Sequence, residues 1–208
     1  MPAPKAMINQ RAAGFPLRDR LLAALAVPSG ESSDFELMPG VSPPEMDWRA
    51  AGVLMAFSAT SGDLVLTKRS SSLRHHPGQI ALPGGKVDPG DADETAAALR
   101  EAHEEVGLAP EQVEVLGALP PHRTVTGFAM TPVLGLIHGP FTPVPEAGEV
   151  AEVFTVPFTH IADPARYRIE RRLWRGDWRA YQTVPFGPYY IWGATARVLQ
   201  SLARRLNA

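Results

Sequence analysis

The chain has 208 residues, a net charge of −2, 45% hydrophobic and 20% charged residues, and no cysteine. This balance is typical of a soluble globular protein, and the length suffices for one substantial core. The near-neutral charge excludes a general basic surface for nucleic acid, and the lack of cysteine excludes disulfides, thiolate metal sites and a cysteine nucleophile.

The amino-terminal sequence MPAPKAMINQRAAGFP lacks the apolar segment of a secretory signal. No apolar run approaches the roughly 20 residues that a membrane-spanning helix needs. We therefore expect a cytoplasmic protein whose partner is neither a membrane nor a nucleic acid.

Helices are predicted near both ends of the chain and at its centre, over residues 16–27, 94–106 and 191–206. A connector rich in Pro, Ser and Gly (28–47) follows the first helix, and a short helical turn is expected over 158–163. Apolar, partly β-branched runs predict strands over 51–59, 63–69, 112–119, 131–139, 149–156, 167–174 and 179–186. The first two strands form a hairpin, and Gly176-Asp177 turns the last two. Runs of strands with few helices predict an α+β fold with a mixed sheet.

Three glutamates crowd into five positions of the central helix, Glu101 to Glu105. Glu101 and Glu105 share a helix face, Glu104 lies beside Glu101, and Arg100 can hold the Glu104 carboxylate four residues on. Repulsion among exposed like charges costs about a few tenths of a kcal/mol per pair. A hard divalent cation such as Mg²⁺ reverses that sign because it prefers oxygen ligands. The helix alone leaves a solvated acidic face as the alternative.

The context of the helix favours a site over an acidic surface. Gly84-Gly85 upstream can turn sharply and approach a ligand, and Gly107 can end the helix. Asp91 and Asp93 are candidate caps at its start. The sequence therefore predicts a strand end, a loop and a helix arranged around the carboxylates.

This segment resembles the signature of the Nudix hydrolases, G-x5-E-x7-R-E-U-x-E-E-x-G-U, where U is aliphatic. Its second half matches Arg100 to Leu108, with Ala102 at an aliphatic position. In the first half the glutamate position, counted from Gly85, holds Asp91, and eight residues rather than seven precede Arg100.

The resemblance implies a Nudix-like α/β/α sandwich with a mixed sheet, in which residues 1–45 form an amino-terminal helix and connector extension and residues 46–208 the Nudix hydrolase domain. It also implies cleavage of a diphosphate linked to a second moiety, with Mg²⁺ or Mn²⁺ as cofactor. The metal ligands would be Glu101, Glu104 and Glu105, with Arg100 beside them in the catalytic set. Some members use a glutamate from a distant loop as the base; the candidates are Glu146, Glu149 and Glu152.

The preceding residues 65–85 resemble a second signature, L-L-T-x-R-[SA]-x3-R-x3-G-x3-F-P-G-G, of the coenzyme A pyrophosphatase branch of this family. Val65 replaces its first Leu and Leu82 its Phe; the other signature positions match, including Arg69 and Arg74. This resemblance implies hydrolysis of coenzyme A, its thioesters or its oxidised forms to adenosine 3′,5′-bisphosphate and 4′-phosphopantetheine or its acyl derivative.

Substrate would then contact Arg69, Arg74, Gly84 and Gly85. Lys68 is expected to end a strand in solvent. Five aromatic residues could stack on an adenine, although core packing is the default for them: Trp174, Trp178, Phe186, Tyr189 and Tyr190. ADP-ribose, a dinucleotide or a nucleoside triphosphate are alternative substrates, and a non-catalytic nucleotide-binding module is a further alternative. The predicted partner is a small molecule, and a homodimer is compatible with the sequence.

Overall fold

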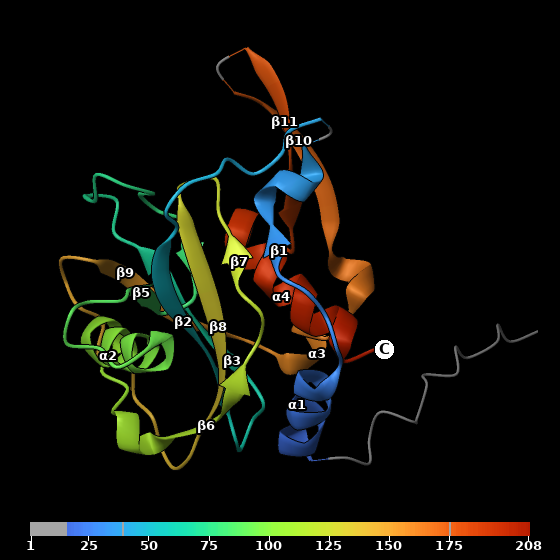
Figure 1. The fold of residues 1–208 in the computed structure, drawn as a ribbon. Helices are drawn as coiled ribbons and strands as arrows, with labels where there is room; N and C mark the ends of the chain where they lie inside the picture. The colour runs from blue at the N-terminus through green and yellow to red at the C-terminus, as the bar shows by residue number, and fades with distance from the viewer. Residues whose placement is uncertain (1–15, 39, 175) are drawn as a thin grey trace, which may run out of the picture.

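The structure is a computed structural model that describes residues 16–38, 40–174 and 176–208. A mixed sheet lies at its centre with helices on both sides (Figure 1). The helices are α1 (Leu17–Ala26), α2 (Glu94–Val106), α3 (Phe158–Ile161) and α4 (Gly193–Arg205), with 3₁₀ turns η2 (Asp34–Leu37), η3 (Pro110–Gln112) and η4 (Pro164–Arg166). The strands of the central sheet are β1 (Ser32–Ser33), β2 (Arg49–Ser58), β3 (Leu64–Arg69), β4 (Ile80–Ala81), β5 (Gly84–Lys86), β6 (Val113–Ala118), β7 (His122–Arg123), β8 (Phe128–Ile137) and β9 (Val150–Val156). No helix in these ranges is long and apolar enough to cross a membrane.

The sheet combines parallel and antiparallel pairs. β2 runs parallel to β8 along its whole length, and β1 runs parallel to β7. β3 and β5 pair antiparallel with β2, and β4 and β9 pair antiparallel with β3. The predicted hairpin of β2 and β3 is present, with Phe57 paired to Leu64 next to the turn. The prediction of an α+β fold with a mixed sheet is therefore confirmed.

Alternating side chains divide the interior into two cores, one on each face of the sheet. On one face, Ala98, Ala102 and Val106 of α2 pack against Leu54 and Val65 of the sheet. On the other face, α1, α3 and α4 share a larger core with the intervening positions of β2, β3 and β8. Figure 1 shows α2 on one side of the strands and α1 and α4 on the other. This is the helix–sheet–helix layering that the resemblance implied.

The described part of the predicted amino-terminal extension packs on this same core. Leu21 and Ala24 of α1 are buried in it. Within the predicted connector, β1 pairs with β7, and Ser33 and Glu36 form a capping box at the start of η2. Residues 1–15 lie outside the described ranges.

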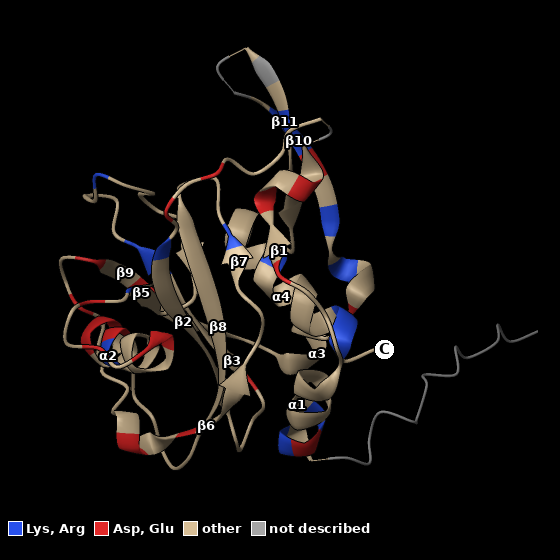
Figure 2. Ribbon diagram, in the orientation of Figure 1, with Lys and Arg blue, Asp and Glu red and all other residues tan. Residues whose placement is uncertain are grey.

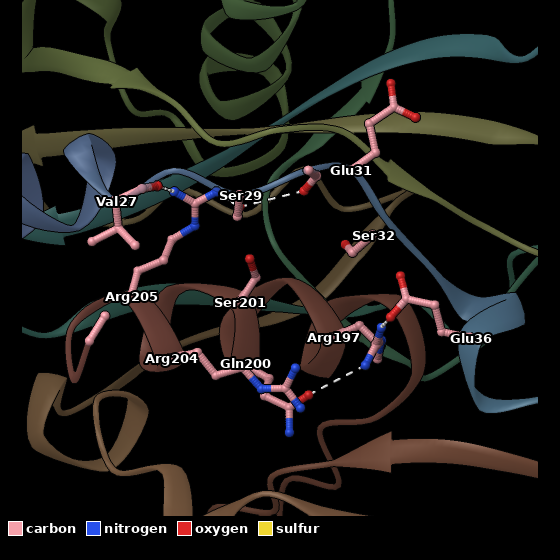
Figure 3. Close-up of a pocket in the computed structure, with 12 residues that line it drawn as sticks. Val27, Ser29, Glu31, Ser32, Glu36, Arg197, Gln200, Ser201, Arg204 and Arg205 are labelled. Atoms are coloured by element: carbon pink, nitrogen blue, oxygen red, sulfur yellow. Dashed lines mark hydrogen bonds and ion pairs between the residues drawn. The ribbon is translucent and has the colours of Figure 1, made fainter.

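Helix α4 buries charge as well as apolar side chains. Val198 and Leu202 are buried as its amphipathic pattern predicts, but Arg197 and Arg205 are each only 6% exposed. Figure 3 shows both arginines reaching from α4 to the segment that follows α1. Arg205 donates to the Val27 carbonyl at 2.7 Å and also to the Ala24 carbonyl and the Ser29 hydroxyl.

Arg197 bonds the carboxylate of Glu36 and the Ser33 carbonyl. The two arginines thereby hold the connector against α4, and hydrogen bonds to charged groups are among the stronger ones in proteins.

The predicted carboxyl-terminal hairpin is present with different bounds. It consists of β10 (Arg168–Trp174) and β11 (Asp177–Thr183), so Asp177 belongs to a strand and not to the turn. Past Thr183 the chain leaves the ladder, because Pro185 has no N–H to donate. The backbone of Phe186 and Tyr189 instead closes a tight turn. The prediction of a strand through residue 186 was therefore wrong.

Candidate functional site

Helix α2 is fixed at both ends, which holds its glutamates in place. The Asp93 side chain accepts a hydrogen bond from the Ala96 amide at 2.8 Å, so the predicted cap at the start of α2 is confirmed. Gly107 ends the helix in a left-handed conformation, φ 72°. The connection from β8 to β9 covers the last carbonyls, because the amide of Glu146 donates to the carbonyl of Glu105 at 3.0 Å.

Gly84 and Gly85 bring the backbone of β5 against the carboxylates of α2. The Gly84 amide donates to Glu105 Oε2 at 3.2 Å. Gly84 has φ 150°, and a Cβ there would clash with the backbone of Gly52. A Cβ on Gly85 would clash with the carboxylate of Glu101. Both predicted glycines therefore lie at the glutamates, where only a bare backbone fits.

The carboxylates of Glu101 and Glu105 are held in an environment that opposes their charge. Glu105 is only 5% exposed. The pKa of Glu105 is raised to about 7, chiefly by burial and also by the charges of Glu101 and Glu149, against the opposing effects of the Gly84 amide and Arg69. Burial also raises the pKa of Glu101, opposed by hydrogen bonding from Arg100. Perturbed, partly buried acids of this kind are concentrated at functional sites.

Arg100 lies at the centre of the acidic network. It donates to Glu101 and to Glu104, each at 3.0 Å, which confirms the predicted contact with Glu104. It also makes a two-pronged contact with Asp91, Nε to Oδ1 and Nη2 to Oδ2, both at 3.0 Å. The expectation that Asp91 caps the helix was therefore wrong. Asp91 is the counter-ion of Arg100, and that contact lowers the pKa of Asp91.

The two signature arginines differ in position. Arg69 Nη1 lies 3.9 Å from Glu105 Oε1, and its Nε is buried with no hydrogen-bond partner among the described residues. Arg74 is exposed in the loop between β3 and β4, and no hydrogen bond or ion pair joins it to the part of the chain that the structure describes. The fold brings Arg69 to the glutamates and leaves Arg74 outside them.

The three candidate bases also separate. Figure 2 shows acidic residues gathered on α2 and on the neighbouring segment that leads into β9. The charge of Glu149 raises the pKa of both Glu101 and Glu105, so Glu149 lies within electrostatic reach of them. The Glu146 carboxylate instead accepts from the Glu149 amide at 2.7 Å. The Glu152 carboxylate accepts a hydrogen bond from the hydroxyl of Tyr189, away from α2.

The donor set suits a hard divalent cation. Glu101, Glu104 and Glu105 supply only oxygen ligands, and a cation would relieve the burial and like-charge repulsion that raise the pKa values of Glu101 and Glu105. Across residues 16–38, 40–174 and 176–208, no three acidic or histidine side chains are gathered tightly enough to form a ready-made metal cage. The chemistry of these oxygen donors fits Mg²⁺ or Mn²⁺. In their present orientation, however, Glu104 accepts a hydrogen bond from Arg100 and Glu105 accepts one from the Gly84 amide.

A second feature lies next to these residues and was missed by sequence reasoning. A pocket of about 720 Å³ opens beside β3 and is lined by Lys68, Glu152, Tyr189 and Trp192, among others. Lys68 was expected to end a strand in solvent; it is exposed, as expected, and it also lines this pocket. Side chains alternate along a strand, so the alternation that places Arg69 near Glu105 places Lys68 on the other face of the sheet. This alternation was the signal in the sequence that could have indicated a role for Lys68 on that face.

Comparison with known proteins gives a consistent result. The family model described as NUDIX domain matches residues 46–174. The uncharacterized Nudix hydrolase NudL of Enterobacter sp. (strain 638) is 42% identical over 84% of this chain and 92% of its own length. The protein of the same name from Escherichia coli (strain K12) is 39% identical over the same shares. Among solved structures, the Nudix hydrolase RenU from M. smegmatis is 30% identical over 56% of this chain and 73% of its own, with a TM-score of 0.44.

Proposed function

The chain belongs to the Nudix family, and we propose that it hydrolyses the diphosphate bond of coenzyme A, its thioesters or its oxidised forms. The products are adenosine 3′,5′-bisphosphate and 4′-phosphopantetheine or its acyl derivative. Hydrolysis is supported by relatives that carry the name Nudix hydrolase and are about 40% identical over most of both chains.

One observation carries the choice of substrate. Arg69 belongs to the segment that resembles the coenzyme A branch, and Glu105 belongs to the general Nudix signature. The two side chains lie 3.9 Å apart although their segments are separated by the loop, β4 and β5. Arginine binds phosphate oxygens through a planar fork, and the unpartnered buried Nε of Arg69 leaves donor capacity for that purpose. This proximity supports the view that the segment resembling the coenzyme A branch and the segment resembling the Nudix signature contribute to one site.

Glu101, Glu104 and Glu105 would hold Mg²⁺ or Mn²⁺, which supplies neutralisation of the diphosphate charge and a more acidic bound water. The residues of the chain do the positioning. Arg100 fixes the orientation of the Glu101 and Glu104 carboxylates, and Arg69 binds a diphosphate oxygen. Gly84 and Gly85 let the substrate approach the backbone, and Arg74 reaches it from the loop.

Hydrolysis also needs a group that accepts the proton of the attacking water. Of the three distal candidates, we assign this role to Glu149, because its charge acts on Glu101 and Glu105 and no side-chain hydrogen bond among the described residues engages its carboxylate. Glu152 is bonded to Tyr189 on the other face of the sheet, and we assign it no part in proton transfer.

A cytoplasmic location, a small-molecule partner, the absence of nucleic-acid and membrane partners, and compatibility with a homodimer belong to the same proposal. A non-catalytic module is the least favoured alternative, because all three carboxylates of the Nudix signature are present.

The test is incubation of the purified protein with coenzyme A and Mg²⁺ or Mn²⁺, followed by chromatography. We expect adenosine 3′,5′-bisphosphate to appear, and none to appear when a chelator is added. Parallel reactions contain ADP-ribose, a dinucleotide and a nucleoside triphosphate. Cleavage of one of these without cleavage of coenzyme A would refute the substrate and keep the enzyme class.

The variant to test in the same assay is Glu105→Gln, which keeps the size of the side chain and removes its charge. Turnover should fall by about 10³-fold or more, the scale on which the loss of a charge-stabilising group acts at catalytic sites. Glu111→Gln, in η3 and outside the site, is the control and should retain the wild-type rate. Unchanged turnover of Glu105→Gln would remove Glu105 from the mechanism.

A further inference from the structure

The pocket beside β3 lies on the face of the sheet opposite α2. Leu64 and Leu66 of β3 belong to the core on the α4 side, whereas Val65 between them belongs to the core under α2. Alternation along the strand carries Lys68 to the α4 side, where it lines the pocket, and Arg69 to the α2 side, where it approaches Glu105. One strand therefore separates the pocket from the glutamates.

Lys68 provides the pocket with a positive charge that forms no ion pair among the described residues, and the pocket lining contains two cations, Lys68 and Arg172, against one carboxylate, Glu152. The cross-strand neighbour of Lys68 on β9 is Glu152, but the Glu152 carboxylate is bonded by the hydroxyl of Tyr189. Within the described ranges, no carboxylate lies at ion-pair distance from the Lys68 ammonium. Arg172 of β10 lines the same pocket and adds a second cation. A hollow with this balance attracts an anion.

Aromatic rings with fixed orientations form the rest of the wall. Tyr189 stacks on Phe154, with ring centroids 3.6 Å apart and planes 8° apart. Trp192 packs edge-on against Tyr181 at 5.4 Å. Each ring is held by a neighbour and also lines the pocket, so it presents a flat apolar surface of the kind on which nucleobases stack. The volume of about 720 Å³ is in the range of ligand sites.

We propose that this pocket binds the nucleoside end of the substrate, an adenine nucleoside that carries a phosphate separate from the diphosphate. Lys68 and Arg172 contact that phosphate, and Tyr189 and Trp192 flank the base. The inference rests on the proposed function, because it places the diphosphate at Glu105 and carries the substrate past the end of β3, which lies at Arg69. Lys68 is then a specificity-determining residue and takes no part in bond cleavage.

The first test measures binding without catalysis. Adenosine 3′,5′-bisphosphate and adenosine 5′-phosphate are titrated calorimetrically into the chelator-treated protein. We expect the bisphosphate to bind about 10- to 100-fold more tightly, the gain typical of a hydrogen bond to a charged group. Lys68→Met should abolish most of this difference while leaving the affinity for the monophosphate unchanged, and Lys68→Arg should retain it.

The control variant is Arg204→Met, which removes an exposed cation of α4 that lies outside this pocket. It should leave both affinities at the wild-type values. Equal binding of the two nucleotides by the wild-type protein, or an unchanged preference in Lys68→Met, would overturn the assignment of the pocket.

The second test separates this inference from the proposed function. With Mg²⁺ present, Lys68→Met should raise KM for coenzyme A by about tenfold or more, leave kcat within about twofold, and leave KM for 3′-dephospho-coenzyme A unchanged. If the wild-type enzyme cleaves both substrates with equal KM, the pocket assignment fails and the hydrolase stands. If the wild-type protein prefers the bisphosphate in the calorimeter but cleaves neither substrate, the proposed function fails and the pocket stands.

Discussion

Helices α2 and α4 contain 13 residues each and cover opposite faces of one sheet, yet they use their buried charges differently. On α2, burial raises the pKa values of Glu101 and Glu105, and neighbouring carboxylates, including Glu149, raise them as well. On α4, burial likewise lowers the pKa of Arg205 and leaves its Nε without a partner among the described residues, but its two terminal nitrogens donate to three neutral oxygens.

The difference shows how a site can be told from a structural tie. A charged group whose surroundings satisfy it stabilises the fold by joining distant segments. A charged group whose surroundings oppose it costs folding free energy, and that cost is retained where a ligand or cation compensates it. By this criterion, α2 carries the chemistry and α4 carries the scaffold.

The largest effect should come from neutralising Glu105 on α2. In the presence of a chelator at pH 8, Glu105→Gln should raise the free energy of unfolding by on the order of 2–3 kcal/mol, because the amide still accepts the Gly84 N–H and no longer buries a charge. The pKa of Glu105 rises on folding from 4.5 to about 7. Ionisation therefore opposes folding, and the advantage of the variant should be absent below about pH 4.5, grow up to about pH 7 and stay constant above it.

Urea denaturation across this pH range measures the difference. Glu104→Gln is the control, since the Glu104 side chain is 57% exposed and should change stability little. A Glu105→Gln protein less stable than the wild type at pH 8 would contradict the view that this carboxylate is held against its preference.

The second prediction tests the scaffold role of α4. Arg205→Met should lower the free energy of unfolding by about 2 kcal/mol, because the Val27 carbonyl loses its Arg205 donor and the Ala24 carbonyl keeps only the Val27 amide. The value of kcat should be unchanged. Thermal denaturation and a kinetic assay on the same preparation give both numbers.

Arg204→Met changes the neighbouring, exposed arginine and should alter stability by less than about 0.5 kcal/mol. Loss of activity in Arg205→Met without loss of stability would reverse the roles assigned to the two helices.

A smaller effect is expected from Gly85→Ala in β5. The added methyl group meets the end of the Glu101 side chain, which can swing aside, so stability should change by less than about 1 kcal/mol. Turnover should fall by about tenfold or more because the Glu101 carboxylate is displaced. Gly90→Ala in the same loop meets no atom within 4 Å and is the control. Equal activities of the two variants would separate Glu101 from the reaction.

The smallest effect is expected from Asp91→Asn. Arg100 keeps its contacts with Glu101 and Glu104 but loses one charged partner, so turnover should fall only about two- to fivefold. Because Arg100 lowers the pKa of Asp91, the stabilisation by this carboxylate is present above its unfolded pKa of about 3.8 and is lost as the pH falls through the lower folded value.

The difference in Tm between the wild-type protein and Asp91→Asn should therefore be constant near neutral pH and vanish in acid. Asp47→Asn, at an exposed position before β2, should match the wild type throughout. A difference that does not shrink as the pH falls would show that the Arg100 contact is not its cause.

Much of α2 could be predicted because its information is local. The helix, its Asp93 cap, its Gly107 end and the Arg100–Glu104 contact all follow from spacings of four residues or fewer. Asp91 could not be placed, because its partner is set by the course of the loop before the helix and not by helical spacing. The same limit applies to Arg69 and Arg74, which the signature treats alike and the fold separates.

The sequence by itself determined the α+β class, the order of most elements and the acidic turn of α2, since periodicity and turn residues act over a few positions. Only the tertiary structure decided that Arg205 is buried against the end of α1. It also decided that Arg69 approaches Glu105 and that Lys68 lines a pocket with Glu152 and Tyr189. Such contacts join segments far apart in the chain, and their energies depend on burial and on partners that no local pattern specifies.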